Sequence, residues 1–274
     1  MLSPPTAIPQ NPLDPTSPLR PFPFPSIIPP MPSPSTPHPS VRKAVLLAAG
    51  RGTRMRELTN DLPKPMIQVR GKPILLHIVE GLKDAGIEHF LIVVGYRADV
   101  VHDFFGDGQC LGTHIQYVTQ VVQDGTGRVV DLARDFAGPD PFVLSYGDIL
   151  VNPANYKRLT TPQPDQEALI SVKRNEDVSK GGAVFVNDQF ELTDLREKPK
   201  PGEPTSPWYN AGIYTFRPSI FTFTASLQPS PRGEYELTDA IRALAQSGNK
   251  VQALELEGDW ADVRDPEVLA ELNR

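Results

Sequence analysis

The chain has 274 residues, a formal net charge of −6, a single cysteine and 31 prolines. An acidic balance disfavours nucleic acid as the main partner, and one cysteine cannot form an internal disulfide, which is typical of the reducing cytoplasm. Because no run of about 18 apolar residues occurs, we expect no transmembrane helix and no membrane partner.

The first forty residues differ in composition from the rest. They hold 15 of the 31 prolines, with one acidic and one basic residue. Such spacing of prolines removes backbone donors and opposes helix and strand, so we expect a disordered or polyproline-like tail. It has no basic start and no unbroken apolar core, unlike a secretory signal. It could instead bind a proline-recognising domain, or be non-native, with Val41 as the true start. We predict one folded domain over residues 41–274.

Continuous apolar strands alternate with helices in the first half of this domain. The expected strands cover residues 44–48, 90–94, 114–118 and 142–145, and the expected helices cover 73–85, 98–105 and 127–136. Further on, we expect strands at 168–173, 183–186, 190–196, 209–216 and 251–256, and helices at 236–245 and 265–273. The pattern predicts an α/β fold: a Rossmann-like, mostly parallel sheet flanked by helices, followed by a smaller, more antiparallel portion.

A glycine-rich turn follows the first expected strand. Glycines let backbone N–H groups approach a polyphosphate, and Arg54 and Lys64 could neutralise its charge. Gly50 and Gly52 lack the Lys-Ser/Thr partner of a Walker loop. Met55 stands where a dinucleotide fingerprint needs its third glycine. On the two glycines alone, an ordinary strand-to-helix turn remains an equal alternative.

The longer string around this turn is far more specific. It resembles the signature of the sugar-1-phosphate nucleotidyltransferases, whose fold is of the glycosyltransferase-A type. Those enzymes join a nucleoside triphosphate to a sugar 1-phosphate and release pyrophosphate. The resemblance rests on Leu47, Ala48, Ala49, Gly50, Gly52, Thr53 and Arg54, then on Pro63-Lys64-Pro65 and on Gly71-Lys72-Pro73. It implies that residues 47–50, 52 and 53 bind the nucleotide and that Arg54 and Lys64 are catalytic.

Two aspartates are candidates for a metal site. Asp148 ends the apolar strand at 142–145, where ligands gather on a parallel sheet, although a turn aspartate is an alternative. Asp262 lies in a Trp-x-Asp motif and alone could be an exposed loop acid. The family resemblance implies that both aspartates hold Mg²⁺ and that Asp148 is catalytic. The chain departs from the family directly afterwards, with Arg264-Asp265-Pro266 in place of Gly-Thr-Pro.

Base recognition has candidates between residues 120 and 128. The Gln120 amide offers a donor and an acceptor, which match one edge of uracil or thymine. Gly125 could let the ring lie against backbone, and Thr126 begins an expected helix. Similar enzymes bind a pyrimidine base with the residues that correspond to Gln120 and Gly125. Arg128 is either a solvated helix charge, which we favour, or a phosphate contact.

The sugar 1-phosphate should meet polar residues of the second half. By resemblance, Gly182 and Glu197 would bind the sugar, Lys198 its phosphate, and Asn210 the sugar or its substituent. Taken alone, each of these residue types is more often an exposed surface residue. Their order along the chain matches the family, which makes a joint role the better hypothesis.

We therefore predict an enzyme that uses UTP or dTTP, a sugar 1-phosphate and Mg²⁺. An in-line attack by the sugar phosphate would release pyrophosphate. Transfer to a non-sugar phosphate such as phosphocholine is an alternative, but it calls for an aromatic or acidic cage. A non-catalytic nucleotide-sugar sensor is a second alternative. The sugar, the base and a homo-oligomeric state stay open.

Overall fold

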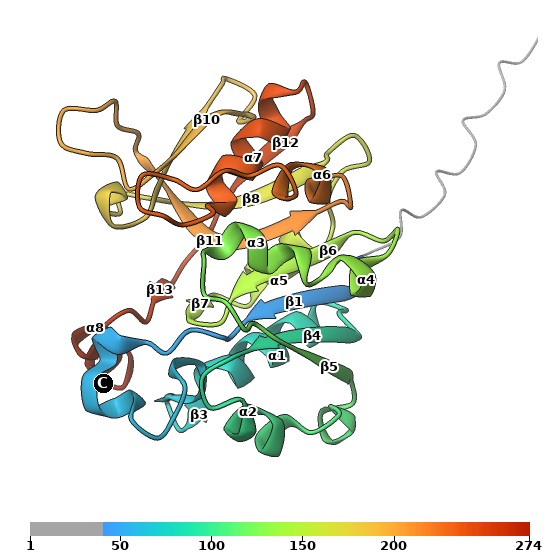
Figure 1. Cartoon of the computed structure of the whole chain (residues 1–274), viewed down its shortest axis with the longest axis vertical. Coiled ribbons are helices and arrows are strands. Elements are labelled where there is room, and N and C mark those ends of the chain that lie inside the picture. Colours follow the sequence, from blue (N-terminus) through green and yellow to red (C-terminus); the bar gives the residue numbers. More distant parts are fainter. Residues whose placement is uncertain (1–40) are drawn as a thin grey trace, which may run out of the picture. The chain divides into compact units, whose positions relative to one another are not determined.

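A nine-stranded mixed sheet forms the centre of the computed structural model (Figure 1). The structure describes residues 41–274, the side chain of Arg56 excepted. The predictions of a tail, of a proline-domain ligand and of a non-native start all fall on residues 1–40, which lie outside the described residues.

The first half of the sheet is parallel, as predicted. Its strands lie side by side in the order β6 (Phe142–Tyr146), β1 (Lys43–Leu47), β4 (His89–Val94) and β5 (His114–Thr119). β6, β1 and β4 have nearly continuous apolar sequences because both faces of the sheet are covered there, whereas the edge strand β5 also carries exposed polar residues. Ligand-binding loops are therefore expected at the carboxyl ends of β1 and β6, which are neighbours.

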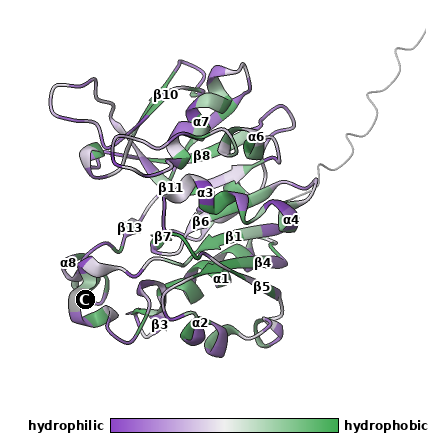
Figure 2. Ribbon diagram, in the orientation of Figure 1, coloured by the Kyte–Doolittle hydropathy of each residue, from purple (hydrophilic) through white to green (hydrophobic). Residues whose placement is uncertain are grey.

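Alternating residues of β1 feed two hydrophobic cores. Ala44 and Leu46 face the core built on α1 (Ile74–Asp84), α2 (Ala98–Phe105) and α5 (Ala154–Leu159). Val45 faces the opposite core, which contains residues of α3 (Thr126–Asp131), α4 (Arg134–Ala137), α6 (Ile220–Thr224) and α7 (Leu237–Gln246). Figure 2 shows the apolar residues concentrated in the strands and the polar ones in the loops.

The second half of the sheet is largely antiparallel. β11 (Trp208–Phe216) pairs antiparallel with β6, β8 (Ala168–Arg174) and β9 (Gly182–Val186). β10 (Leu192–Glu197) extends β9, and β12 (Val251–Glu255) runs parallel to β8. A register shift between Asn210 and Tyr214 bends β11 close to the end of β6. The predicted combination of a parallel part and a more antiparallel part is confirmed.

Several short elements were not predicted. β7 (Ile149–Val151) pairs antiparallel with β13 (Trp260–Asp262), and β2 (Gln68–Val69) with β3 (Lys72–Pro73). The single helix predicted over 127–136 is two helices, α3 and α4, because Leu132 and Ala133 bond backwards over three residues instead of four. Helix α8 (Pro266–Leu272) begins as predicted, with the Asp265 side chain accepting from the backbone N–H of Val268. Within residues 41–274, no helix is long and apolar enough to cross a membrane.

Candidate active site

The glycine-rich turn leaves β1 beside the end of β6. The backbone N–H of Gly147 donates to Leu47 O at 3.0 Å, so the turn starts directly next to Asp148. Gly52 has φ 70°, and a Cβ there would lie 2.6 Å from Cβ of Lys64. Glycine is therefore needed at position 52 for two reasons: the positive φ and the lack of room for a Cβ atom. Lys64 packs against the backbone of Gly52. Gly50 is exposed with open space around it.

A two-stranded ribbon brings the predicted metal-binding aspartates together. Asp148 immediately precedes β7 and Asp262 ends β13, where it pairs with Ile149. The backbone N–H of Val263 donates to Asp148 O at 3.0 Å, which closes the ribbon at this end. Two acids that are far apart in the sequence therefore become neighbours through strands of only three residues.

Lys64 is the central cation of this carboxylate pair. Its Nζ pairs with Asp148 and lies 3.9 Å from Asp262 Oδ1. Arg264 Nε lies 3.6 Å from the other oxygen of Asp262. Burial, and next the charge of Asp148, raises the pKa of Asp262 to about 6, against the opposing effect of Lys64 and Arg264.

This donor set fits magnesium with a nucleotide. Within the described range, no group of three or more His, Cys, Asp or Glu side chains could hold a metal by itself. Magnesium typically binds one or two carboxylates and completes its shell with water and substrate phosphates. Asp148 and Asp262 supply that partial shell; burial first, and then repulsion from Asp148, raises the pKa of Asp262.

A cavity of about 200 Å³ extends from these aspartates toward the antiparallel half of the sheet. It joins residues predicted from distant motifs: Arg54, Thr126, Asp148, Gly182, Glu197, Lys198, Asn210 and Asp262 all line it. Lys64 reaches it through its contact with Asp148. The turn residues 47–53 are not part of its wall; Thr53 lines a separate hollow with Arg51 and Asn60.

The predicted base-binding segment lies differently from what we expected. Gln120 Nε2 donates to Val122 O at 3.0 Å, and Gln120 does not line the cavity. Gln123, which was not predicted, donates from Nε2 to Ala49 O at 3.1 Å and so ties this loop to the glycine-rich turn. A Cβ at Gly125 would lie 2.4 Å from Tyr235 O, so the space at this glycine is taken by the protein's own backbone.

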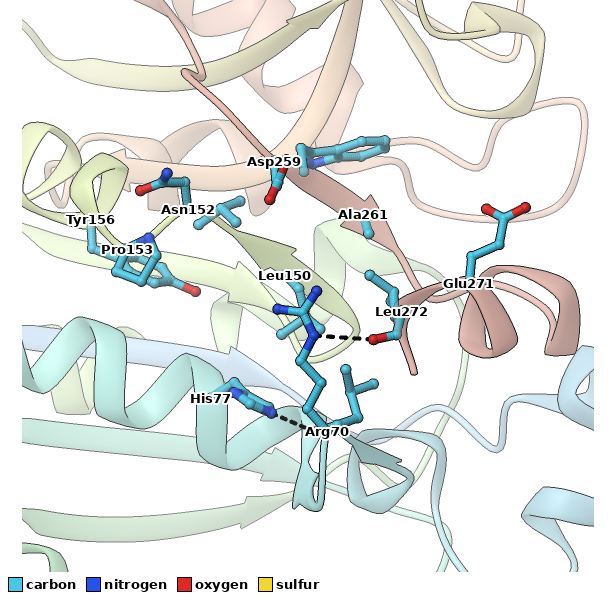
Figure 3. A pocket seen from close by; sticks show the side chains of 13 residues that line it. Arg70, His77, Leu150, Asn152, Pro153, Tyr156, Asp259, Ala261, Glu271 and Leu272 are labelled. Atoms are coloured by element: carbon cyan, nitrogen blue, oxygen red, sulfur yellow. Dashed lines mark hydrogen bonds between the residues drawn. The ribbon is translucent and has the colours of Figure 1, made fainter. Parts of the chain in front are cut away.

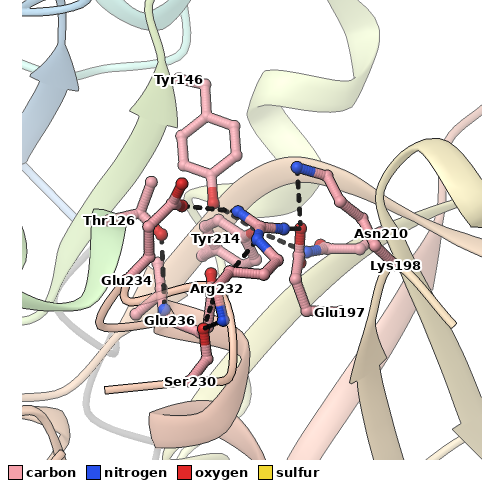
Figure 4. Close-up of polar contacts among 11 residues, drawn as sticks. Thr126, Tyr146, Glu197, Lys198, Asn210, Tyr214, Ser230, Arg232, Glu234 and Glu236 are labelled. Carbon is pink, nitrogen blue, oxygen red and sulfur yellow. Dashed lines mark hydrogen bonds and ion pairs between the residues drawn. The ribbon is translucent and has the colours of Figure 1, made fainter. Parts of the chain in front are cut away.

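Arg232 is the main feature that the sequence analysis missed. Its guanidinium lies 3.5 Å from Glu197 Oε1, 2.5 Å from Glu234 Oε2 and 3.6 Å from Glu236 Oε1 (Figure 4). Burial, and then the charge of Glu236, raises the pKa of Glu197. Arg232 thus lies close to three carboxylates on the cavity wall. Lys198 is a second cation, with Nζ 3.9 Å from Glu197 Oε1. An anionic ligand would find two cations here.

Asn210, which lines the cavity, holds an unpartnered acceptor. Its Nδ2 donates to the Tyr214 hydroxyl at 2.8 Å, which fixes the amide orientation (Figure 4). Its Oδ1 is buried and has no hydrogen-bond partner in the described part of the chain. Such a group is costly unless a ligand donates to it.

A second cavity, of about 520 Å³, lies against the same β7–β13 ribbon (Figure 3). Leu150, Asn152 and Trp260 contribute to its wall. Arg70 Nε donates to Leu272 O at 3.1 Å, which ties the last helix to the β2–β3 hairpin. None of the predicted site residues lines this second cavity.

Comparisons with known proteins agree with these observations. A family model described as nucleotidyl transferase matches residues 43–274. The chain is 38% identical over 229 residues to the UTP–glucose-1-phosphate uridylyltransferase AglF of Haloferax volcanii, which covers 82% of this chain and 92% of that protein. It is 33% identical to a glucose-1-phosphate thymidylyltransferase of Streptomyces griseus, covering 85% of this chain and 65% of that protein. The bifunctional protein GlmU of Methanococcus maripaludis is 36% identical, and the chain spans about half its length, 51%.

Solved structures show the same fold. A UDP-glucose pyrophosphorylase complexed with UDP-glucose superposes with a TM-score of 0.77 at 25% identity, covering 85% of this chain and 97% of that one. A putative glucose-1-phosphate thymidylyltransferase from Bacillus anthracis superposes with a TM-score of 0.75 at 28% identity, covering 84% and 93%.

Proposed function

Because the chain belongs to the nucleotidyl transferase family and is a sugar-1-phosphate nucleotidyltransferase, we propose that it transfers a uridylyl or thymidylyl group to a hexose 1-phosphate. The observation that carries this proposal is the shared cavity. It holds Asp148 and Asp262 at one end and Glu197, Lys198 and Asn210 at the other. A triphosphate and a sugar phosphate could therefore meet inside it.

The charged residues divide between the two substrates. We assign Arg54 and Lys64 to the triphosphate, since both adjoin the aspartate pair. Lys64 would then exchange its contact with Asp148 for phosphate oxygens. Asp148 and Asp262 would hold Mg²⁺, which when bound offsets the negative charge that develops during phosphoryl transfer.

The acceptor would lie toward the antiparallel half of the sheet. Lys198 and Arg232 would hold its phosphate, and Glu197 and Asn210 Oδ1 would accept from its hydroxyl or amide groups. Held in this way, a phosphate oxygen of the sugar attacks the α-phosphorus in line and pyrophosphate leaves. No covalent enzyme intermediate is needed because the attacking group is already an anion.

Pyrimidine selection is assigned to Gln120. Only its Nε2 is engaged, and no partner of Oε1 is found within residues 41–274. The N3–H of uracil or thymine could donate to that oxygen. We assign no direct base contact to Gly125, whose free face is covered by Tyr235.

A pyrophosphate-release screen tests the proposal. UTP, dTTP, CTP, ATP and GTP would each be combined with glucose, galactose and N-acetylglucosamine 1-phosphates in the presence of Mg²⁺. We expect pyrophosphate release with UTP or dTTP and at least one sugar phosphate, and no pyrophosphate release in EDTA. Turnover with phosphocholine alone, or with no acceptor at all, would contradict the proposal.

A further inference from the structure

Tyr209 is a buried tyrosine on the cavity wall whose hydroxyl has no role in the fold. The residue is 5% exposed and lines the cavity together with Gly181 and Asn210. Within residues 41–274, its hydroxyl makes no hydrogen bond, although its strand neighbour Asn210 donates to Tyr214. The hydroxyl oxygen is not one of the fully buried unpaired polar atoms of the described residues, so it is open to the cavity and available to a ligand there.

The protein makes specific room for this hydroxyl. A Cβ added at Gly181 would lie 2.3 Å from the Tyr209 hydroxyl oxygen and 2.5 Å from its Cζ. Gly181 has a negative φ of −154°, and the space taken by Tyr209 is the requirement for glycine that the contacts show. The notch at Gly181 and the ring of Tyr209 are thus complementary.

The ring is also held from its other side. Trp260 meets it edge-on with ring centroids 5.4 Å apart, and Trp260 Nε1 donates to Ala211 O at 3.0 Å. Trp260 lies two residues before Asp262 on β13, so the tyrosine is braced against the strand that carries a proposed metal ligand. Burial, and next the charge of Asp262, raises the pKa of Tyr209, so its hydroxyl keeps the proton and can donate.

Tyr209 adjoins both ends of the cavity. Its ring contacts Trp260, two residues before Asp262, and its strand neighbour Asn210 lines the cavity with Glu197. In the proposed reaction, the 1-phosphate of the sugar lies between the metal and the sugar ring. We propose that the Tyr209 hydroxyl donates a hydrogen bond to the 1-phosphate of the acceptor and so positions the attacking oxygen, an inference that rests on the proposed function.

The first test is Tyr209→Phe, which removes the hydroxyl and keeps the ring. We expect kcat/KM for glucose 1-phosphate to fall about tenfold or more, as for a lost bond to a charged group, with KM for the triphosphate unchanged. Tyr156→Phe is the matched control, since Tyr156 is also buried but lines the second cavity. Equal kinetics of Tyr209→Phe and wild type would overturn the proposal.

Two further measurements separate phosphate binding from other roles. The loss in Tyr209→Phe should be the same with 2-deoxyglucose 1-phosphate; if it disappears with that acceptor, the hydroxyl binds the sugar ring and the proposal is wrong. Gly181→Ala should also lower kcat/KM for glucose 1-phosphate, because its Cβ would displace the Tyr209 ring together with the hydroxyl.

Calorimetry distinguishes failure of this inference from failure of the proposed function. Wild type should bind glucose 1-phosphate more tightly than Tyr209→Phe does. If wild type neither binds glucose 1-phosphate nor releases pyrophosphate with any acceptor, both the function and the inference fail. If wild type binds it and turns over while Tyr209→Phe matches it in both, only the inference fails.

Discussion

Asp148 is the residue on which the proposed chemistry depends most directly. It follows β6, pairs with Lys64 and lines the cavity. Asp148→Asn keeps the size of the side chain but removes a charged metal ligand, so we expect turnover to fall on the order of 1,000-fold. Pyrophosphate release measures the loss, and an unchanged thermal transition would show that the fold is intact. Asp259→Asn is the control, because Asp259 lies on the same segment but lines the second cavity; comparable losses in both variants would contradict the assignment.

The ionised side chain of Asp262 should destabilise the folded state of the metal-free protein. Its pKa is raised from 3.8 to about 6, so the ionised carboxylate is less favourable in the folded state than in the unfolded chain. This cost is fully present above pH 6 and disappears as the pH falls from 6 toward 4. In EDTA at pH 7.5, Asp262→Asn should therefore raise the free energy of unfolding by about 1–3 kcal/mol, while abolishing pyrophosphate release. Urea unfolding at pH 7.5 and pH 4 checks this; an equal gain at both values would contradict the stated cause.

At the scale of elements, the need for a glycine at position 52 of the glycine-rich turn can be tested separately from the need for a positive φ. Gly52→Ala combines a strained positive φ with a clash against Lys64. Gly71, in the β2–β3 turn, has φ +79° but open space around it. Both alanine variants should lose about 1 kcal/mol of stability, whereas only Gly52→Ala should lose activity, through displacement of Lys64. Chemical denaturation and pyrophosphate release separate the two effects, and full activity in Gly52→Ala would show that Lys64 tolerates the move.

Which elements could be predicted follows from how local their causes are. The inner parallel strands β1, β4 and β6 are almost wholly apolar because both faces are covered, and that signal stands in the sequence itself. β7 and β13 are three residues long and partly exposed, and they exist only because each supplies the other's backbone partners. No proline or glycine lies at the break between α3 and α4. Such elements depend on contacts that no short window contains.

The same limit applies to the site at the scale of the molecule. The residues carried by motifs were predicted in order, and the structure gathers many of them on one cavity. Arg232 was missed because its position depends on a long-range contact: Tyr235 donates to Asp124 O at 2.8 Å, and Gly127 donates to Tyr235 O at 2.7 Å. These bonds dock the loop that carries Arg232 onto the loop after β5. Local sequence contains the arginine but not that contact.

A cavity shared by both halves of the sheet predicts how the product acts on the whole molecule. A nucleotide sugar would touch the turn after β1 and β10–β11 at once, so its binding should stabilise the two halves together. At a concentration 100 times its Kd it would add about 2.7 kcal/mol, which for a domain of this size is a rise in Tm of about 5 °C or more. Thermal shift with UDP-glucose or dTDP-glucose measures the rise. Hydrogen exchange should then show protection both around Arg54, which lines the cavity, and in residues 197–210. Protection confined to one of these segments would show that the ligand does not span the cavity, and the division of residues between nucleotide and sugar would have to be redrawn.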